Sequence, residues 1–386
     1  MRLATVGLLL VLAVGLMAAG GMVAADSSID TVDRQDILDL DTDESPDRHG
    51  QSASADLGLG ADATDATLRA ELEQRTVAAE LRKAPPDERA AIVESYLERL
   101  DDEVEALVQA DIDSLEAATQ GELTVRELLI EATETGYTAS ARQQTLNDLA
   151  ALDDAVPDLD VTAAVTRLEL RYDIIAGPTR DRVLAAATDP DRPTTIGLEV
   201  TTAGLALISV DEHRYHREAV RYDRFAMPGD AVETLSAAES IAAEAYPSST
   251  ATVALRDLGA GLYHVERSLP AGSVTAFVGG GSEAVVVERQ YRWLDQVEVD
   301  LANSVDEDGV ELTIERSFTG GPLRVTITDA DTGAAIEGTA YLRHGGTWTP
   351  LGAVDEGGQV WGPDPGGPID IRVVTPDGII SVSAER

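Results

Sequence analysis

The chain has 386 residues, of which 70 are acidic and 29 basic, so its formal net charge is −41. Nucleic acids and anionic lipid head groups are bound by clusters of Lys and Arg, so this charge argues against both as partners. The absence of cysteine excludes a disulfide framework and a lipid-modified cysteine anchor.

The first 25 residues have the pattern of an export signal. Arg2 precedes the uncharged stretch Leu3 to Ala25, and Asp26 opens an acidic run after it. A positive end, an apolar centre and a small-residue site are typical of a secretory signal, which predicts cleavage after Ala25. The alternative is an uncleaved anchor, because an uncharged helix of this length can span a bilayer core of roughly 30 Å. Both alternatives place the rest of the chain outside the cytoplasm, either secreted or tethered to the membrane by residues 3–25.

Residues 26–65 are acidic and contain few apolar side chains. Such a segment buries too little apolar surface to offset the chain entropy lost on folding. The composition predicts a disordered, extended spacer. An acidic tail that docks on a partner is the alternative.

Residues 66–188 are expected to form an α-helical domain. One expected helix has an apolar seam with alternating spacings of four and three, which consists of Val93, Leu97, Leu100, Val104 and Leu107. The seam covers about two heptads, fewer than a coiled coil usually needs, which favours packing within the chain over a dimer contact. Thr124 and Glu127 have the spacing of a capping box at the start of another helix.

A turn cluster at residues 189–193 marks a boundary, and residues 194–296 are expected to form a small antiparallel α/β domain. A helix is expected from Ala231 to Tyr246, with four strands after it. The helix that contains Leu235-Ser236-Ala237-Ala238-Glu239 and ends at Tyr246-Pro247, with the strands around Tyr263-His264-Val265 and Val285-Val286-Val287, resembles the PepSY family. This resemblance implies an extracytoplasmic binding or regulatory module, in some members tied to the control of a peptidase.

Residues 297–386 contain short alternating strands separated by turn signals, which predicts a β-sandwich. The turn Asp329-Ala330-Asp331-Thr332-Gly333 and the later Asp355-Glu356-Gly357-Gly358 resemble those of carboxypeptidase-regulatory-like and other prealbumin-type Ig-like domains. In both turns the glycine is expected to supply a positive φ and the first aspartate to cap the turn. The resemblance implies a recognition module without chemistry of its own.

The composition is also unusual in its cations, since Lys83 is the only lysine. Arginine in place of lysine, abundant acidic residues and few aromatics resemble proteins of extreme halophiles, especially haloarchaeal secreted or membrane-tethered proteins of uncharacterised function. In concentrated salt the Debye length falls to about 3 Å at 1 M, which screens the self-repulsion of the chain.

The sequence predicts no catalytic, cofactor-binding or metal-binding residues and therefore no cofactor. Asp329 and Asp331 resemble the start of a calcium loop, but Ala340 stands where the bidentate glutamate is needed, so a tight turn is favoured. His213 and His216 are three apart and would lie on opposite faces of a strand, which disfavours a metal pair.

Trp348 and Trp361 are the remaining candidates. Each either packs in the sandwich core or marks a contact surface, where tryptophan is enriched. Trp293, near the domain junction, is expected to pack between domains.

These features together predict a multidomain α+β protein with an N-terminal helical domain, a small antiparallel α/β domain and a C-terminal Ig-like β-sandwich. The leading functional hypothesis is a non-enzymatic exported envelope protein that binds or organises an unknown protein partner at the cell surface. The alternative is a PepSY-like regulator or inhibitor of an extracytoplasmic peptidase. A hydrolase built from carboxylates distant in the sequence is the third hypothesis.

Overall fold

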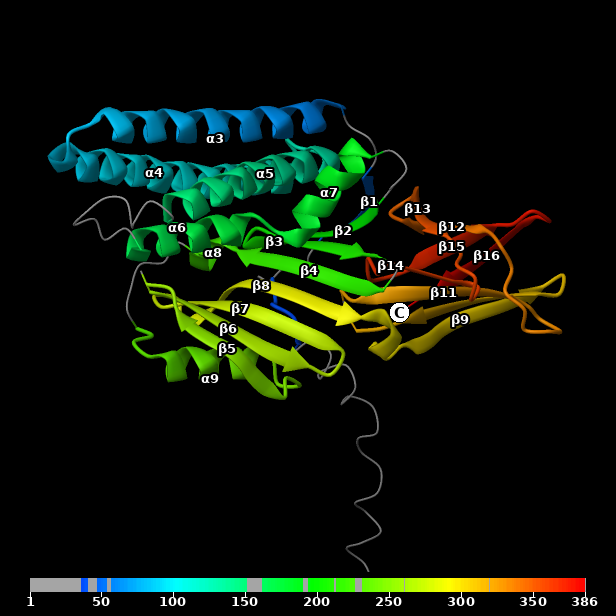
Figure 1. Cartoon of the computed structure of the whole chain (residues 1–386). Helices are drawn as coiled ribbons and strands as arrows, with labels where there is room; N and C mark the ends of the chain where they lie inside the picture. Colours follow the sequence, from blue (N-terminus) through cyan, green and yellow to red (C-terminus); the bar gives the residue numbers. More distant parts are fainter. Residues whose placement is uncertain are drawn as a thin grey trace, which may run out of the picture.

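A computed structural model describes the fold of the chain over residues 36–40, 47–53, 57–150, 162–189, 194–211, 213–225, 231–259, 261–318 and 320–385. In these residues a helical layer lies on one face of a large antiparallel sheet, and a β-sandwich adjoins one end of that sheet (Figure 1). The α+β architecture predicted from the sequence, with helices first and a sandwich last, is confirmed.

The helical layer consists of long antiparallel helices that bury leucine and valine against each other. The bounds are α3 Leu57–Lys83, α4 Pro86–Thr119, α5 Val125–Ala150, α6 Thr162–Ile175 and α7 Pro178–Thr188. The seam of α4 faces the neighbouring helices, with Val93, Leu100 and Val104 at most 1% exposed. Packing of this seam within the chain is therefore confirmed.

The capping box at the start of α5 is also confirmed. Thr124 N–H donates to the Glu127 carboxylate at 2.8 Å, and Glu127 N–H donates to Thr124 Oγ1 at 3.3 Å. These bonds satisfy amides that the first turn of a helix leaves without partners, and so fix where α5 begins.

The large sheet has the strand order β1-β2-β3-β4-β8-β7-β6-β5, all antiparallel, among the described residues. Its strands are β1 Asp47–Ala53, β2 Thr194–Val200, β3 Gly204–Val210, β4 Arg214–Arg221, β5 Ala251–Asp257, β6 Leu262–Leu269, β7 Gly272–Gly279 and β8 Ala284–Trp293. The short helix α8 Tyr222–Phe225 follows β4, and the 3-10 helix η3 Leu294–Gln296 follows β8. Helix α9, Leu235–Ala245, covers the opposite face of β5 to β8 from the helical layer.

The helical layer and the large sheet share one hydrophobic core. Leu115 of α4, Leu128 of α5 and Val183 of α7 belong to the same buried cluster as Leu198 of β2 and Leu207 of β3. The two parts that the sequence suggests as separate domains are therefore joined through their apolar faces.

The expected disordered spacer over residues 26–65 is wrong for several of its residues. Asp47–Ala53 forms β1, paired with β2, and α3 already begins at Leu57. Residues 36–40 lie against the large sheet, with Leu38 7% and Leu40 2% exposed. Composition argues against folding in isolation, but the rest of the molecule supplies the apolar surface and the strand edge that this segment lacks.

In the C-terminal part, the described residues form two four-stranded sheets packed face to face, with orders β14-β11-β10-β9 and β13-β12-β15-β16. The strands are β9 Asp300–Glu307, β10 Val310–Arg316, β11 Pro322–Asp329, β12 Thr339–His344, β13 Thr347–Ala353, β14 Gln359–Pro363, β15 Ile369–Val374 and β16 Ile379–Ala384. The first strand begins at Asp300, so the first residues of the predicted range 297–386 lie outside the strands and follow η3.

Both turns of the sandwich have the predicted geometry. Gly333 has φ 69° and Gly358 has φ 77°. Asp329 accepts a hydrogen bond from Thr332 N–H at 2.8 Å, and Asp355 accepts one from Gly357 N–H at 2.9 Å. The tight turn favoured over a calcium loop at Asp329 is therefore observed.

Candidate functional site

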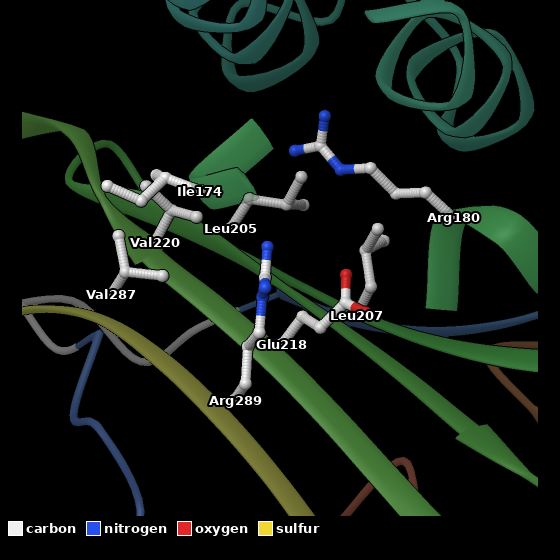
Figure 2. A pocket seen from close by; sticks show the side chains of 8 residues that line it. All are labelled: Ile174, Arg180, Leu205, Leu207, Glu218, Val220, Val287 and Arg289. Carbon is white, nitrogen blue, oxygen red and sulfur yellow. The ribbon is translucent and has the colours of Figure 1, made fainter. Parts of the chain in front are cut away.

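The interior between the helical layer and the large sheet contains two small cavities. Figure 2 shows the side chains that line one of them, which come from α6, α7, β3, β4 and β8. Each cavity has a volume of about 10 Å³, which is room for about one water molecule. These two spaces are too small to admit an organic substrate.

The charged side chains around these cavities are engaged with other protein groups. Glu218 accepts a hydrogen bond from Thr179 N–H at 2.5 Å, at the N-terminus of α7, where the helix dipole favours a carboxylate. Burial raises the pKa of Glu218, an effect that nearby Arg289 opposes. Arg289 pairs with Asp173 of α6 at 2.8 Å. These contacts attach the helical layer to the sheet.

A second buried polar group lies beside the first. Arg180 of α7 pairs with Asp111 of α4 at 2.8 Å, and both side chains are 4% exposed. Tyr222 Oη donates to the same carboxylate at 2.7 Å. Since Asp111 of α4 is bound by a guanidinium of α7 and a hydroxyl of α8, its role in this structure is to join these three helices.

The histidines considered for metal binding have other surroundings. His216 Nε2 lies 2.8 Å from a guanidinium nitrogen of Arg182. Burial lowers the pKa of His216 to about 4, and the charge of Arg182 adds to this effect. Within the described residues, no group of three or more His, Asp or Glu side chains is placed to hold a metal ion.

Of the candidate tryptophans, Trp361 of β14 lies at the junction between the sandwich and the large sheet. It packs against the buried cluster of Ile208, Tyr215, Leu294 and Phe318. That cluster does not include Trp293, whose ring instead meets Tyr291 edge to face at 6.1 Å and lies 4.1 Å from the Arg214 guanidinium. The interdomain position expected for Trp293 is therefore occupied by Trp361.

Trp348 of β13 lies on the outer face of the sandwich. The guanidinium carbons of Arg343 and Arg372 lie 4.8 and 4.4 Å from the centre of its ring. Arg372 also lies 5.1 Å from the ring centre of Tyr341. These four residues are called the Trp348 cluster below, and all four are partly exposed.

Strand register explains the cluster. Trp348 pairs with Arg343 across β13 and β12, and Arg343 pairs with Asp370 across β12 and β15. Arg372 pairs with Tyr341 in the next row. Because alternate residues of a strand share a face, Ala340 and Leu342, which alternate with Tyr341 and Arg343 along β12, are buried and point inward.

The sequence singles out Trp348 but not its neighbours. The signal that could have found them is the period of two in Tyr341-x-Arg343 and Asp370-x-Arg372. Such a surface, with two aromatic rings held by two guanidinium groups, has the side-chain types that dominate protein–protein binding energies. Cation–π contacts of this kind add about 0.5–1 kcal/mol each at exposed sites.

The predicted cleavage site after Ala25 and the anchor at residues 3–25 lie outside the described residues. Of the helices in the described part of the chain, none is long and apolar enough to cross a membrane.

The helical layer, the large antiparallel sheet and the two packed C-terminal sheets define a multidomain α+β protein with an Ig-like sandwich at its C-terminal end. Comparison with protein families divides the chain at similar places. Residues 1–192 match a domain of unknown function (DUF7096), and residues 196–298 match a family of unknown function (DUF7094). Residues 302–382 match the archaeal fibronectin-III type-like domain.

No curated protein and no solved structure matches the chain. The Ig-like sandwich predicted from the sequence is confirmed. The family that matches it is of the archaeal fibronectin-III type and not the carboxypeptidase-regulatory-like family that its turns resemble.

Proposed function

We propose that the chain is a non-enzymatic, extracytoplasmic protein of an archaeal cell envelope that binds another protein through the Trp348 cluster. The observation that carries this proposal is the stacking of Arg343 and Arg372 on Trp348, on the outer face of a sheet. The uncharged leader and the arginine-rich, lysine-poor composition support export into a salty medium. Neither of the two interior cavities fits the site of a carboxylate hydrolase, because each has room for about one water molecule and its charged groups are engaged.

The charge of the Trp348 cluster indicates which kind of protein it would bind. The cluster carries two guanidinium groups, of which Arg343 pairs with Asp370 at 2.8 Å. In a chain of net charge −41, a surface that is not acidic is suited to an acidic protein, as the other proteins of such an envelope would be. High salt screens long-range attraction, so binding would rest on ring stacking and close hydrogen bonds, which act at contact distance.

A photo-cross-linking residue in place of Ser381 tests the proposal, because Ser381 is exposed and pairs with Arg372 across β15 and β16. We expect a specific adduct in envelope fractions at high salt, and its loss when Trp348→Ala is added. The same probe at the exposed Ser236 of α9 is the matched control. An adduct that persists in the Trp348→Ala variant would contradict the proposal.

The second candidate function is a PepSY-like regulator of an extracytoplasmic peptidase. The observation that favours it is the packing of α9 on β5 to β8, where Ala238 and Ala242 are fully buried against Val265 and Val274. This function predicts that the purified chain changes the rate of a peptidase from the same envelope. No change in that rate at saturating chain concentration would exclude it.

A further inference from the structure

Residues 36–40 cross the face of the large sheet opposite the helical layer, and side chains of the sheet bind their main chain. This segment is called the strap. In Figure 1 it is part of the dark-blue chain behind β8. Five main-chain groups of the strap are bound in this way. They are Asp36 O to Gln290 Nε2 at 2.8 Å, Leu38 N to Glu288 Oε2 at 2.5 Å, Leu38 O to Arg217 Nη2 at 3.1 Å, Asp39 O to Arg221 Nη1 at 2.8 Å and Leu40 O to Thr201 Oγ1 at 3.0 Å.

An ion pair holds both main-chain groups of Leu38. Glu288 accepts from its N–H while Arg217 donates to its carbonyl oxygen, and Arg217 pairs with Glu288 at 2.5 Å and with Glu199 at 3.0 Å. The pair thus offers the acceptor and the donor that a neighbouring strand would offer in a sheet. Recognition at this point depends on the backbone of the ligand.

The side chains of the strap supply the sequence preference. Leu38 and Leu40 are buried in the cluster under α9, together with Val232 and Tyr246. Ile37 packs on the other side, in the cluster at the sandwich junction. The carboxylate of Asp36 accepts hydrogen bonds from the N–H of Ser248, at 3.2 Å, and from its hydroxyl.

The strap covers a surface of the sheet that includes Arg217, Arg221, Glu199, Glu288 and Gln290, which is called the groove below. The charged groups of this groove fit a bound peptide better than a permanent core. The side chains of Arg217, Glu288 and Glu199 are 1%, 0% and 4% exposed. A buried ionic group of this kind gives little net stability compared with apolar side chains, because desolvation offsets the attraction. Here the strap covers this ionic group, and Glu288 and Arg217 also bind the amide and carbonyl groups of the strap.

We propose that this groove is a peptide-binding site for an extended segment with an acidic residue followed by apolar residues one, two and four positions later. Its resident ligand is the strap of the same chain, and its occupant in trans is the strap of a second copy. Exchange of identical segments between copies is a low-cost route to association. The six residues between the strap and β1 can extend over about 20 Å, which gives the segment reach. This proposal is independent of the Trp348 cluster.

A synthetic peptide of residues 33–43 tests the site. The protein is the full chain carrying Leu38→Asp and Leu40→Asp, which weaken its own strap and leave the groove unchanged. We expect the peptide to bind this variant at least tenfold more tightly than the unaltered chain, whose strap competes for the groove. The Tm of the variant should rise with peptide concentration, because a ligand that binds only the folded state stabilises it.

The control is the same peptide with its own Leu38→Asp change, which should neither bind nor raise the Tm. If the variant folds, the peptide should raise its Tm. If the variant does not fold alone, the peptide should raise its refolding yield. If the peptide changes neither binding signal nor Tm nor refolding yield, the site is overturned.

Cross-linking identifies the occupant. The chain has no native cysteine, so a thiol cross-linker reacts only at the introduced cysteines. Chains with Asp39→Cys and chains with Thr202→Cys are mixed and treated with a short thiol cross-linker, because both residues are exposed and Thr202 is next to Thr201, which binds the strap. We expect a cross-linked dimer from the mixture, and an internal cross-link in the chain that carries both changes. The Asp39→Cys chain mixed with the Ser236→Cys chain is the control and should give no dimer. A cross-link that forms only within the double variant overturns the second copy as occupant.

Discussion

The large sheet and the C-terminal sandwich are both antiparallel, but they bury different side chains. The core between the two sheets of the sandwich is aliphatic, with Leu312, Val325, Ile327 and Ile371 at 0% exposure. Its buried ion pair of Arg316 with Asp364 lies where β10 and β14 end. The large sheet buries charged residues on both of its faces. These include Glu199, Arg217, Glu218, Arg221 and Glu288.

The difference arises from what covers each sheet. Each sheet of the sandwich is covered on one face by its partner, so apolar and polar residues alternate as they do in the sequence. The large sheet has the helical layer on one face and both α9 and the strap on the other. Charged residues in its strands therefore become interior groups that need partners from distant segments.

Removal of Arg217 should produce the largest loss of stability. The Arg217→Ala change leaves Glu199 and Glu288 buried without their cation, and we expect the free energy of unfolding to fall by about 3–5 kcal/mol. Urea unfolding at constant high salt measures this. The triple change Arg217→Met, Glu199→Leu and Glu288→Leu, which removes the charges together, should recover most of the loss. A loss below about 1 kcal/mol for the single change would show that the charges are hydrated rather than buried.

His216 should make the large sheet sensitive to acid. Because its pKa is lowered from 6.5 to about 4 in the folded state, its contribution to stability is present above pH 6.5 and is lost as pH falls toward 4. The linkage amounts to at most roughly 3 kcal/mol. His216→Gln should therefore reduce the loss of unfolding free energy between pH 6.5 and pH 4. An identical loss in the variant and the unaltered chain would contradict this prediction.

A small cavity in the sandwich should have a smaller effect, since only packing is lost there. Ile371 is fully buried on β15, and Ile371→Val removes one methylene group without disturbing a charge. We expect a loss of about 0.5–1.5 kcal/mol in urea unfolding. The effect should not depend on pH between 4 and 6.5, in contrast to that of His216→Gln.

The smallest effect is expected for an arginine on the outer face of the sandwich. Arg343 pairs with Asp370, but the two side chains are 42% and 33% exposed. Arg343→Ala should lower the free energy of unfolding by about 0.2–1 kcal/mol. The same change should abolish the Ser381 adduct or strongly reduce it. A loss as large as that of Arg217→Ala would mean that the outer face is covered.

Local signals predicted several details of the fold. The capping box at Thr124 and the positive φ of Gly333 and Gly358 depend on residues within a few positions of each other. The sequence indicates Trp348 as a candidate contact residue only because it is a tryptophan. Its partners Arg343 and Arg372 come from two other strands, so their approach to the ring depends on register, which the sequence does not state directly.

Other features of the structure arise from contacts between distant parts of the chain and could not be predicted from the sequence. The position of Trp361, rather than Trp293, at the junction follows from how the sandwich adjoins the large sheet. The strap is the clearest example, because its acidic composition predicts disorder. Its order comes from Arg217, Arg221, Glu288 and Gln290, about 180 to 250 residues away in the chain.

The sequence by itself determined the order of helical and β regions, the turns of the sandwich and the acidic, lysine-poor character of the chain, since all of these arise from local pattern and composition. Only the tertiary structure decided which charges are buried, which tryptophan packs at the junction with the sandwich and where the N-terminal segment lies. The physical reason is that burial is a property of both faces of a strand, and the second face is covered by segments that are remote in the chain.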